Sequence, residues 1–271
     1  MKQIILFYLL CISTNIAFGG VDTVQVYSEA MGQTIPNLVI TPKDYTEQND
    51  ELPVIYLLHG AGGYFSNWFF RVPEIEQYAT DYNIIIVCPD GNKTSWYIDS
   101  PIDSTSQYES YITRELVPAI DQKYRTIKQK NGRAITGLSM GGHGAFYLAF
   151  RHQDIWGAAG SMSGGVNIIP FAEEWNMDEI LGPYHQFKKN WEDHTVINLI
   201  HLLNGDLKII FDCGTEDFFA DVNKELHEKL VIEGIPHEYT VRPGKHNWDY
   251  WRNSIKYHLL YFDDCFKNPL N

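Results

Sequence analysis

Short runs of apolar residues alternate along most of the chain with longer segments whose apolar positions recur at helical spacing. Runs without polar interruption are typical of strands buried on both faces of a sheet. Strands are predicted at residues 53–58, 83–88, 133–137, 155–161, 207–213 and 237–242. Helices are predicted at residues 71–82, 107–124, 219–232 and 248–262, with a further helix directly after residue 139. This alternation predicts an α/β fold with a mostly parallel central sheet and helices on both faces.

Three segments depart from that alternation. Residues 21–40 alternate loosely between apolar and polar positions, which predicts an antiparallel pair of strands at one edge of the sheet. Pro118 lies inside the helical pattern of residues 107–124, so we expect a kink or an early end there. Residues 163–205 are interpreted as short helices over the carboxyl ends of the strands, where they would shape substrate choice. Helical packing without ligand contact is the alternative for this segment.

Residues 1–19 have the pattern of a secretory signal peptide. Lys2 precedes an apolar run at residues 4–12 that is too short to span a bilayer, and small residues stand at Ala17 and Gly19, where a signal peptidase cuts. Cleavage after Gly19 predicts a secreted or periplasmic protein with a single domain at residues 20–271. Lipid attachment at Cys11 and a buried N-terminal strand are the alternatives.

Net charge and the number of cysteines restrict which binding partners and which disulfide bonds the chain can have. The chain has 271 residues with a net charge of −13, which disfavours nucleic acids and anionic membrane surfaces as partners. Removal of residues 1–19 leaves Cys88, Cys213 and Cys265. Because an odd number of cysteines leaves at least one thiol unpaired, we predict no disulfide framework. A bridge between Cys88 and Cys213 would require that their strands be neighbours.

The first candidate for chemistry is the pentapeptide from Gly137 to Gly141, with Ser139 at its centre. It has the spacing of a nucleophile elbow, in which a serine stands on a sharp turn between a strand and a helix. The glycines remove Cβ atoms that would collide in this turn. The N-terminus of the following helix favours a negatively charged oxygen. A glycine turn with a solvated serine is the alternative, because the pentapeptide alone is a weak signal.

A serine nucleophile needs a histidine base and an acid that orients it. In this kind of fold both partners follow the serine, in loops at the carboxyl ends of strands. His246 is the candidate base because it lies between the last strand and the last helix. Asp217 is the candidate acid, in the loop after the strand at 207–213, with Glu216 as the alternative. Asp212 would lie within the strand end.

The oxyanion of the reaction needs two backbone N–H groups directed at one point. One is expected from Met140, directly after the nucleophile, and the other from Ala61 in the glycine-rich loop after the strand at 53–58. His59 is expected to brace that loop. Aromatic side chains that could stack on a substrate are Trp96, Tyr97 and Trp248, with core packing as the alternative.

With these residues in place, the chain resembles the α/β-hydrolase "putative esterase" family. This family includes feruloyl and acetylxylan esterases of carbohydrate esterase family 1, S-formylglutathione hydrolase and the mycolyltransferases. The resemblance rests on residues 56–60 (YLLHG), 137–142 (GLSMGG), 213–218 (CGTEDF) and 244–248 (GKHNW). It implies a triad of Ser139, Asp217 and His246, oxyanion donors at Ala61 and Met140, and neither a metal nor an organic cofactor.

The resemblance also implies a function. We expect a secreted serine esterase that removes feruloyl or acetyl groups from plant polysaccharide, or cleaves small aryl or acetyl esters, through an acyl-enzyme. Export disfavours an S-formylglutathione hydrolase, which is a cytosolic thioesterase. Two more functions compete with the esterase: an acyltransferase of the mycolyltransferase type and a non-catalytic carbohydrate-binding relative. The acyl group and the sugar stay open at this point.

Overall fold

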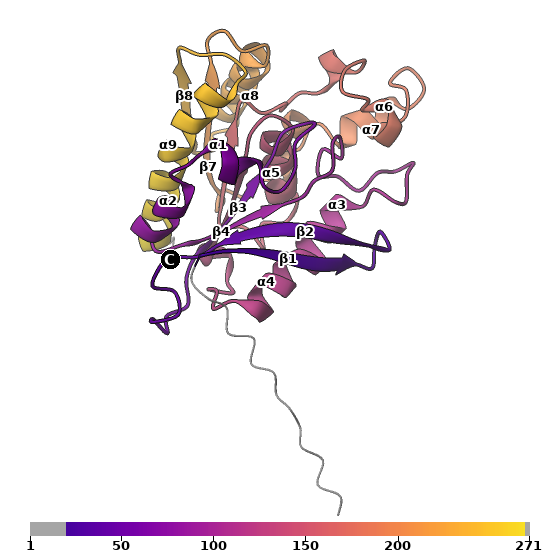
Figure 1. Cartoon of the computed structure of the whole chain (residues 1–271). Coiled ribbons are helices and arrows are strands. Elements are labelled where there is room, and N and C mark those ends of the chain that lie inside the picture. The colour runs from indigo at the N-terminus through magenta and orange to yellow at the C-terminus, as the bar shows by residue number, and fades with distance from the viewer. Residues whose placement is uncertain (1–19, 269–271) are drawn as a thin grey trace, which may run out of the picture.

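The computed structural model describes residues 20–268. The expected signal peptide and Cys11 lie outside these residues. A single sheet with the strand order β1-β2-β4-β3-β5-β6-β7-β8 forms the centre of the molecule (Figure 1). The strands are β1 (Val21–Ser28), β2 (Gln33–Ile40), β3 (Val54–Leu58), β4 (Ile85–Pro89), β5 (Arg133–Gly137), β6 (Ala158–Met162), β7 (Lys208–Gly214) and β8 (Glu238–Arg242).

The sheet has the predicted mixture of strand directions. β1 and β2 pair antiparallel, with Val21 opposite Ile40, and β2 pairs antiparallel with β4. All the other pairs, from β4–β3 to β7–β8, are parallel. The antiparallel edge expected at residues 21–40 and the mostly parallel centre are therefore confirmed. The parallel strands end at a common edge, and the loops that leave this edge carry the candidate site.

Helices cover both faces of the sheet. The α-helices are α1 (Asn67–Arg71), α2 (Ile75–Asp81), α3 (Tyr108–Ser110), α4 (Val117–Lys123), α5 (Met140–Arg151), α6 (Asp178–Leu181), α7 (Lys188–Asp193), α8 (Ala220–Ile232) and α9 (Trp248–Lys267). Helices α1, α2 and α9 lie together on one side of the sheet, and α3, α4 and α5 lie on the other (Figure 1). Buried side chains form a separate hydrophobic core on each face.

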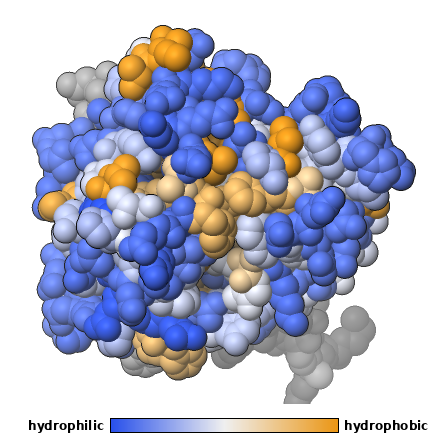
Figure 2. Space-filling view, turned by 90° about the horizontal axis from the view of Figure 1, so that it is seen from above, coloured by the Kyte–Doolittle hydropathy of each residue, from blue (hydrophilic) through white to orange (hydrophobic). Residues whose placement is uncertain are grey.

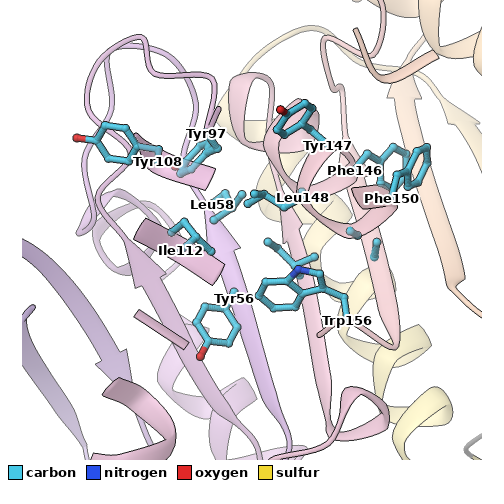
Figure 3. Close-up of a cluster of buried hydrophobic side chains, with 14 of the residues drawn as sticks. Tyr56, Leu58, Tyr97, Tyr108, Ile112, Phe146, Tyr147, Leu148, Phe150 and Trp156 are labelled. Carbon is cyan, nitrogen blue, oxygen red and sulfur yellow. The ribbon is translucent and has the colours of Figure 1, made fainter. Parts of the chain in front are cut away.

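The alternation of side chains along β3 explains how one strand serves both cores. Val54, Tyr56 and Leu58 enter the larger core, whereas Ile55 and Leu57 enter the core beneath α1, α2 and α9. This is why the run appears continuously apolar in the sequence. In the larger core the Tyr56 ring packs edge-on against Trp156 at a centroid distance of 5.2 Å. Figure 3 shows these two residues beneath the side chains of α5.

Two helical segments differ from the prediction, and proline explains both. The helix predicted at 71–82 begins later, as α2 at Ile75–Asp81, and the short α1 at Asn67–Arg71 precedes it; Pro73 between them has no N–H to donate to a helical hydrogen bond. The segment 107–124 stays helical throughout but contains a π-helical stretch at Tyr111–Leu116. Pro118 stands in the first turn of the following α4. The wider π turns directly before Pro118 replace the predicted kink.

The irregular segment contains short helices, and two of the cysteines lie on strands of the sheet. Residues 163–205 form short helices, among them α6 and α7. Cys88 lies on β4 and Cys213 on β7, which are not neighbouring strands, and both thiols are free, as is that of Cys265. Within residues 20–268, no helix has the length and apolar character needed to cross a bilayer.

Candidate active site

Ser139 stands on a strained turn between β5 and α5. Its backbone has φ +55° and ψ −119°, a conformation that residues other than glycine rarely adopt. Its N–H donates to Met162 O of β6 at 3.0 Å, which fixes the turn against the neighbouring strand. A Cβ atom at Gly137 would lie 2.5 Å from Gly141 O, and one at Gly141 would lie 2.6 Å from His59 O. Both glycines are therefore required by close backbone contacts.

Ser139, His246 and Asp217 are in mutual hydrogen-bond contact although they come from three separate loops. His246 Nε2 lies 2.9 Å from Ser139 Oγ. His246 Nδ1 lies 2.9 and 3.0 Å from the two carboxylate oxygens of Asp217. Because a carboxylate can only accept, Nδ1 donates to Asp217 and Nε2 is left to accept the Ser139 hydroxyl proton. This is the geometry that a serine nucleophile and its base require.

The neighbouring acids have different partners. Glu216 points to solvent and lies 3.5 Å from Lys245 Nζ in an exposed ion pair. Asp212 is buried within β7, where His258 Nε2 lies 3.0 Å from its carboxylate and Ser254 also donates to it. Of these three acids, Asp217 is the one that bonds to the His246 ring. The geometry thus favours Asp217 over the alternative acid Glu216.

Two backbone N–H groups lie free beside the nucleophile. Met140 is the first residue of α5, where a helix leaves its N–H groups without intrahelical partners. Ala61 stands in the loop after β3, between Gly60, whose carbonyl accepts from Gly63, and Gly62, whose N–H donates to Lys93 O at 2.8 Å. In the described part of the chain neither Ala61 N–H nor Met140 N–H has a hydrogen-bond acceptor. Both residues are therefore available as oxyanion donors.

The loop that carries Ala61 is braced from below. His59 is buried, donates from Nδ1 to Gly60 O at 2.9 Å and accepts at Nε2 from Gly91 N–H at 2.8 Å. Burial lowers the pKa of His59, which keeps the ring neutral and able to accept. The Tyr97 hydroxyl accepts from His59 N–H at 3.1 Å. These contacts fit the bracing role expected for His59.

The three aromatic side chains expected to stack on substrate divide into two groups. Trp248 lines the cleft that contains Ser139 and His246. Trp96 and Tyr97 are 1% and 0% exposed and do not line it, so the stacking role expected for them is corrected to core packing. Trp96 instead packs behind Trp175 at a centroid distance of 5.8 Å.

The cleft has a volume of about 540 Å³ and two aromatic sides that meet at His246. On one side Phe218 lies 4.2 Å from the His246 ring, and Trp175 stacks on Phe218 at 5.8 Å. On the other side Trp251 lies 4.9 Å from the His246 ring and packs edge-on against Trp248. The rings hold the imidazole in place and offer apolar surface to a ligand. In Figure 2, which looks down on this face, a hydrophobic band crosses the centre and hydrophilic residues surround it.

Several cleft residues could not be identified from the sequence. Trp175 and Asn176 belong to the irregular segment 163–205, which has no periodicity to assign a direction to a side chain. Phe218 could have been identified from the sequence, because it directly follows the candidate acid Asp217. In the structure its side chain is 50% exposed. Among residues 20–268, no group of three or more His, Cys, Asp or Glu side chains is arranged to hold a metal ion.

Comparison with known proteins gives a consistent result. The sequence profile of the family described as "Putative esterase" matches residues 28–262. Esterase Rv1288 of Mycobacterium tuberculosis is 28% identical over 235 residues, which cover 77% of this chain but 51% of that protein. The chain thus spans about half the length of this curated relative. An acetyl esterase of Caldicellulosiruptor saccharolyticus is 23% identical over 252 residues, covering 86% of this chain and 94% of the relative.

Among solved structures, a ferulic acid esterase superimposes with a TM-score of 0.80 at 26% identity. The match covers 92% of this chain and 100% of the esterase chain. Sequence profile, curated relatives and solved structure therefore agree on one family.

Proposed function

The chain belongs to the family described as "Putative esterase" and has the α/β-hydrolase fold, and from that premise we propose that it is a serine carboxylic-ester hydrolase with the triad Ser139, His246 and Asp217. The observation that carries the proposal is the unbroken contact from Ser139 Oγ through the His246 ring to the Asp217 carboxylate, at 2.9 Å on each side.

The first half of the reaction forms an acyl-enzyme. Ser139 Oγ attacks the ester carbonyl carbon while His246 Nε2 takes the hydroxyl proton. The carbonyl oxygen becomes an oxyanion and accepts hydrogen bonds from the N–H groups of Ala61 and Met140. Asp217 keeps the His246 ring oriented and stabilises its charged form. When the tetrahedral intermediate collapses, the bond to the leaving oxygen breaks and His246 Nε2 gives that oxygen its proton, which releases the alcohol.

The second half returns the enzyme to its starting state. Water attacks the acyl carbon, and His246 takes a proton from it. Collapse of the second intermediate breaks the bond to Ser139 Oγ, which recovers its proton from His246 and releases the carboxylic acid. Ester and water are the two reactants, and together they balance the alcohol and the acid that leave.

For the natural substrate we propose a feruloyl or acetyl group on plant polysaccharide. Similarity to a ferulic acid esterase and to an acetyl esterase supports these acyl groups. The two aromatic sides of the cleft also support a substrate with a flat ring. The export expected from residues 1–19 would bring the enzyme to polysaccharide outside the cell.

The test is hydrolysis of methyl ferulate, acetylated xylan and 4-nitrophenyl acetate by the wild-type protein and by Ser139→Ala. We expect Ser139→Ala to lose about 10⁴-fold or more in kcat, while Ser104→Ala, at an exposed position, keeps wild-type rates. Ferulate release indicates an aryl acyl site, and acetate release alone indicates a deacetylase. Equal rates in Ser139→Ala and wild type would overturn the mechanism.

Two further measurements distinguish hydrolysis from the competing functions. A fluorophosphonate should label Ser139 covalently, and absence of labelling would favour a non-catalytic protein. Addition of a sugar acceptor should leave free carboxylic acid as the main product, whereas an acylated acceptor would identify an acyltransferase.

A further inference from the structure

Lys93 is a basic residue in the lining of the cleft. The cleft lining consists of glycine, aromatic, aliphatic and uncharged polar residues, together with Ser139, His246 and this lysine. Among the described residues that form the lining, Lys93 is the one lysine or arginine, and none is an aspartate or a glutamate. Since the whole chain has a net charge of −13, an anionic ligand is repelled by the protein overall and needs a local positive group.

The backbone at Lys93 is fixed on both sides. Lys93 N–H donates to its neighbour's side-chain oxygen, Asn92 Oδ1, at 2.6 Å. Lys93 O accepts from Gly62 N–H at 2.8 Å, in the loop that carries the oxyanion donor Ala61. The lysine therefore stands on a preorganised turn beside the loop that carries Ala61, and little entropy is lost in holding its backbone.

A second polar side chain is brought to the same corner from the irregular segment. Thr94 Oγ1 donates to Trp175 O at 2.5 Å and joins the two segments. The residues next to this bond, Lys93 and Asn176, both line the cleft. Asn176 has φ +54°, a left-handed conformation that asparagine tolerates better than most residues. Its side-chain amide can donate to a ligand in the cleft.

Nearby acids do not neutralise Lys93. Within residues 20–268 its ammonium group has no carboxylate at ion-pair distance, in contrast to Lys245, which pairs with Glu216. The Asp90 carboxylate instead accepts from the backbone N–H groups of Phe65 and Asn92. Glu173 lines a separate hollow together with residues 183–185. The charge of Lys93 is thus available to a ligand.

We propose that Lys93, assisted by Asn176, selects esters that carry a carboxylate, either on the acyl group or on the alcohol, as in a uronic acid. This inference rests on the proposed esterase function and adds to it the class of substrate. A lysine ammonium and an amide N–H group together match the two oxygens of a carboxylate. Both groups are exposed, so their contribution is that of a solvated ion pair, which corresponds to about a 2- to 5-fold preference.

The experiment measures kcat/KM on two matched pairs of esters. The acyl arm compares mono-4-nitrophenyl terephthalate with 4-nitrophenyl 4-methylbenzoate, which replaces the carboxylate by a methyl group. The alcohol arm compares an O-acetylated methyl glucuronoside as the free acid with its primary amide. The proteins are wild type, Lys93→Ala, Lys93→Glu, Asn176→Asp and the control Lys128→Ala, whose lysine is exposed and does not line the cleft.

The measured quantity is kcat/KM on the anionic ester divided by kcat/KM on its neutral partner. We expect this ratio to fall about 2- to 5-fold in Lys93→Ala and further in Lys93→Glu. The fall is expected in the arm whose carboxylate lies where the natural substrate has it. Asn176→Asp should lower it as well, because the new carboxylate competes for Lys93. Lys128→Ala should keep the wild-type ratio, and a high salt concentration should lower the ratio in wild type. If both proteins hydrolyse the esters and the ratio is the same in Lys93→Ala and wild type in both arms, the inference about Lys93 is wrong, whereas the proposed esterase function stands. Absence of any Ser139-dependent hydrolysis would overturn the proposed function and the inference with it.

Discussion

His258 of α9 lies 3.0 Å from the Asp212 carboxylate of β7, and its second ring nitrogen lies 2.9 Å from Thr136 Oγ1 of β5. One buried imidazole thus joins the strand before Ser139, the strand before Asp217 and the helix after His246. The side chains of His258, Asp212 and Thr136 are fully enclosed, with exposed fractions of 0 to 1%. Burial by itself raises the pKa of Asp212, but hydrogen bonds and charges from His258, Ser254 and Arg242 outweigh it and lower the pKa.

Replacement of His258 by alanine should destabilise the fold. The change leaves the Asp212 carboxylate without its buried imidazole partner and opens a cavity, and we expect a loss of about 3 kcal/mol in the free energy of unfolding. Urea denaturation followed by circular dichroism measures this loss. His201→Ala, at an exposed position, is the control. An unfolding midpoint equal to that of wild type would show that the contact does not hold the three elements together.

The identity of the acid can be tested by two amide substitutions. Asp217→Asn replaces a carboxylate, which only accepts, by an amide that can also donate to His246 Nδ1. The ring can then carry its proton on Nε2, the tautomer that cannot accept the Ser139 proton. We expect kcat to fall about 10³-fold or more. Glu216→Gln removes only an exposed ion pair with Lys245 and should change kcat less than about twofold. A larger effect of Glu216→Gln would reverse the assignment.

The aromatic side formed by Trp175 and Phe218 should contribute to recognition of aryl acyl groups. Trp175→Ala removes the outer ring of this stack, so kcat/KM for methyl ferulate should fall about 3- to 10-fold, while ethyl acetate is affected much less. Phe70→Ala is the matched control, because Phe70 is 72% exposed and does not line the cleft. Equal losses on both esters would indicate a structural effect on the cleft in place of ring recognition.

Glu109 should make stability depend on acid pH. Burial alone raises the pKa of its carboxyl, but hydrogen bonds from His152, Arg151 and Tyr147 lower the pKa to about 2. Because the unfolded chain then binds this proton at a higher pH than the folded one, the stabilisation is complete above the ordinary pKa of 4.5 and is lost as the pH falls towards 2. The full effect is about 3 kcal/mol.

Urea midpoints at neutral pH and at two acidic values, about 4 and about 3, measure this dependence. Glu109→Gln should be much less stable than wild type at neutral pH, and the difference should shrink as the pH falls. Glu233→Gln, at an exposed position, should follow the wild-type curve. A difference between Glu109→Gln and wild type that stays constant with pH would contradict the assigned cause.

Much of the fold was predictable because each strand is marked by an apolar run and each loop of the site follows one. Ser139, Asp217 and His246 could be chosen by their positions after such strands, before any contact between them was known. The form of the helix interruptions was harder to predict from the sequence. At Pro118 the sequence indicates a disturbance but not its form, since a kink and a π turn both relieve the missing hydrogen bond.

Side-chain direction outside regular elements could not be predicted. Trp96 and Tyr97 have φ +51° and +59°, and this left-handed backbone, unusual for aromatic residues, turns both rings into the core. Trp175 also has φ +54°, yet its ring lines the cleft. No local pattern separates these two outcomes, because tertiary contacts such as the packing of Trp96 against Trp175 decide them.

The hydrogen bond from Gly62 N–H to Lys93 O uses only main-chain atoms. Any amino acid at position 93 can supply that carbonyl, so the support of the loop that carries Ala61 is independent of the side chain at this position. A substitution at position 93 can therefore remove or reverse the side-chain charge while this main-chain hydrogen bond stays in place. Under the role proposed for Lys93, a change in a single codon is enough to alter the preferred substrate.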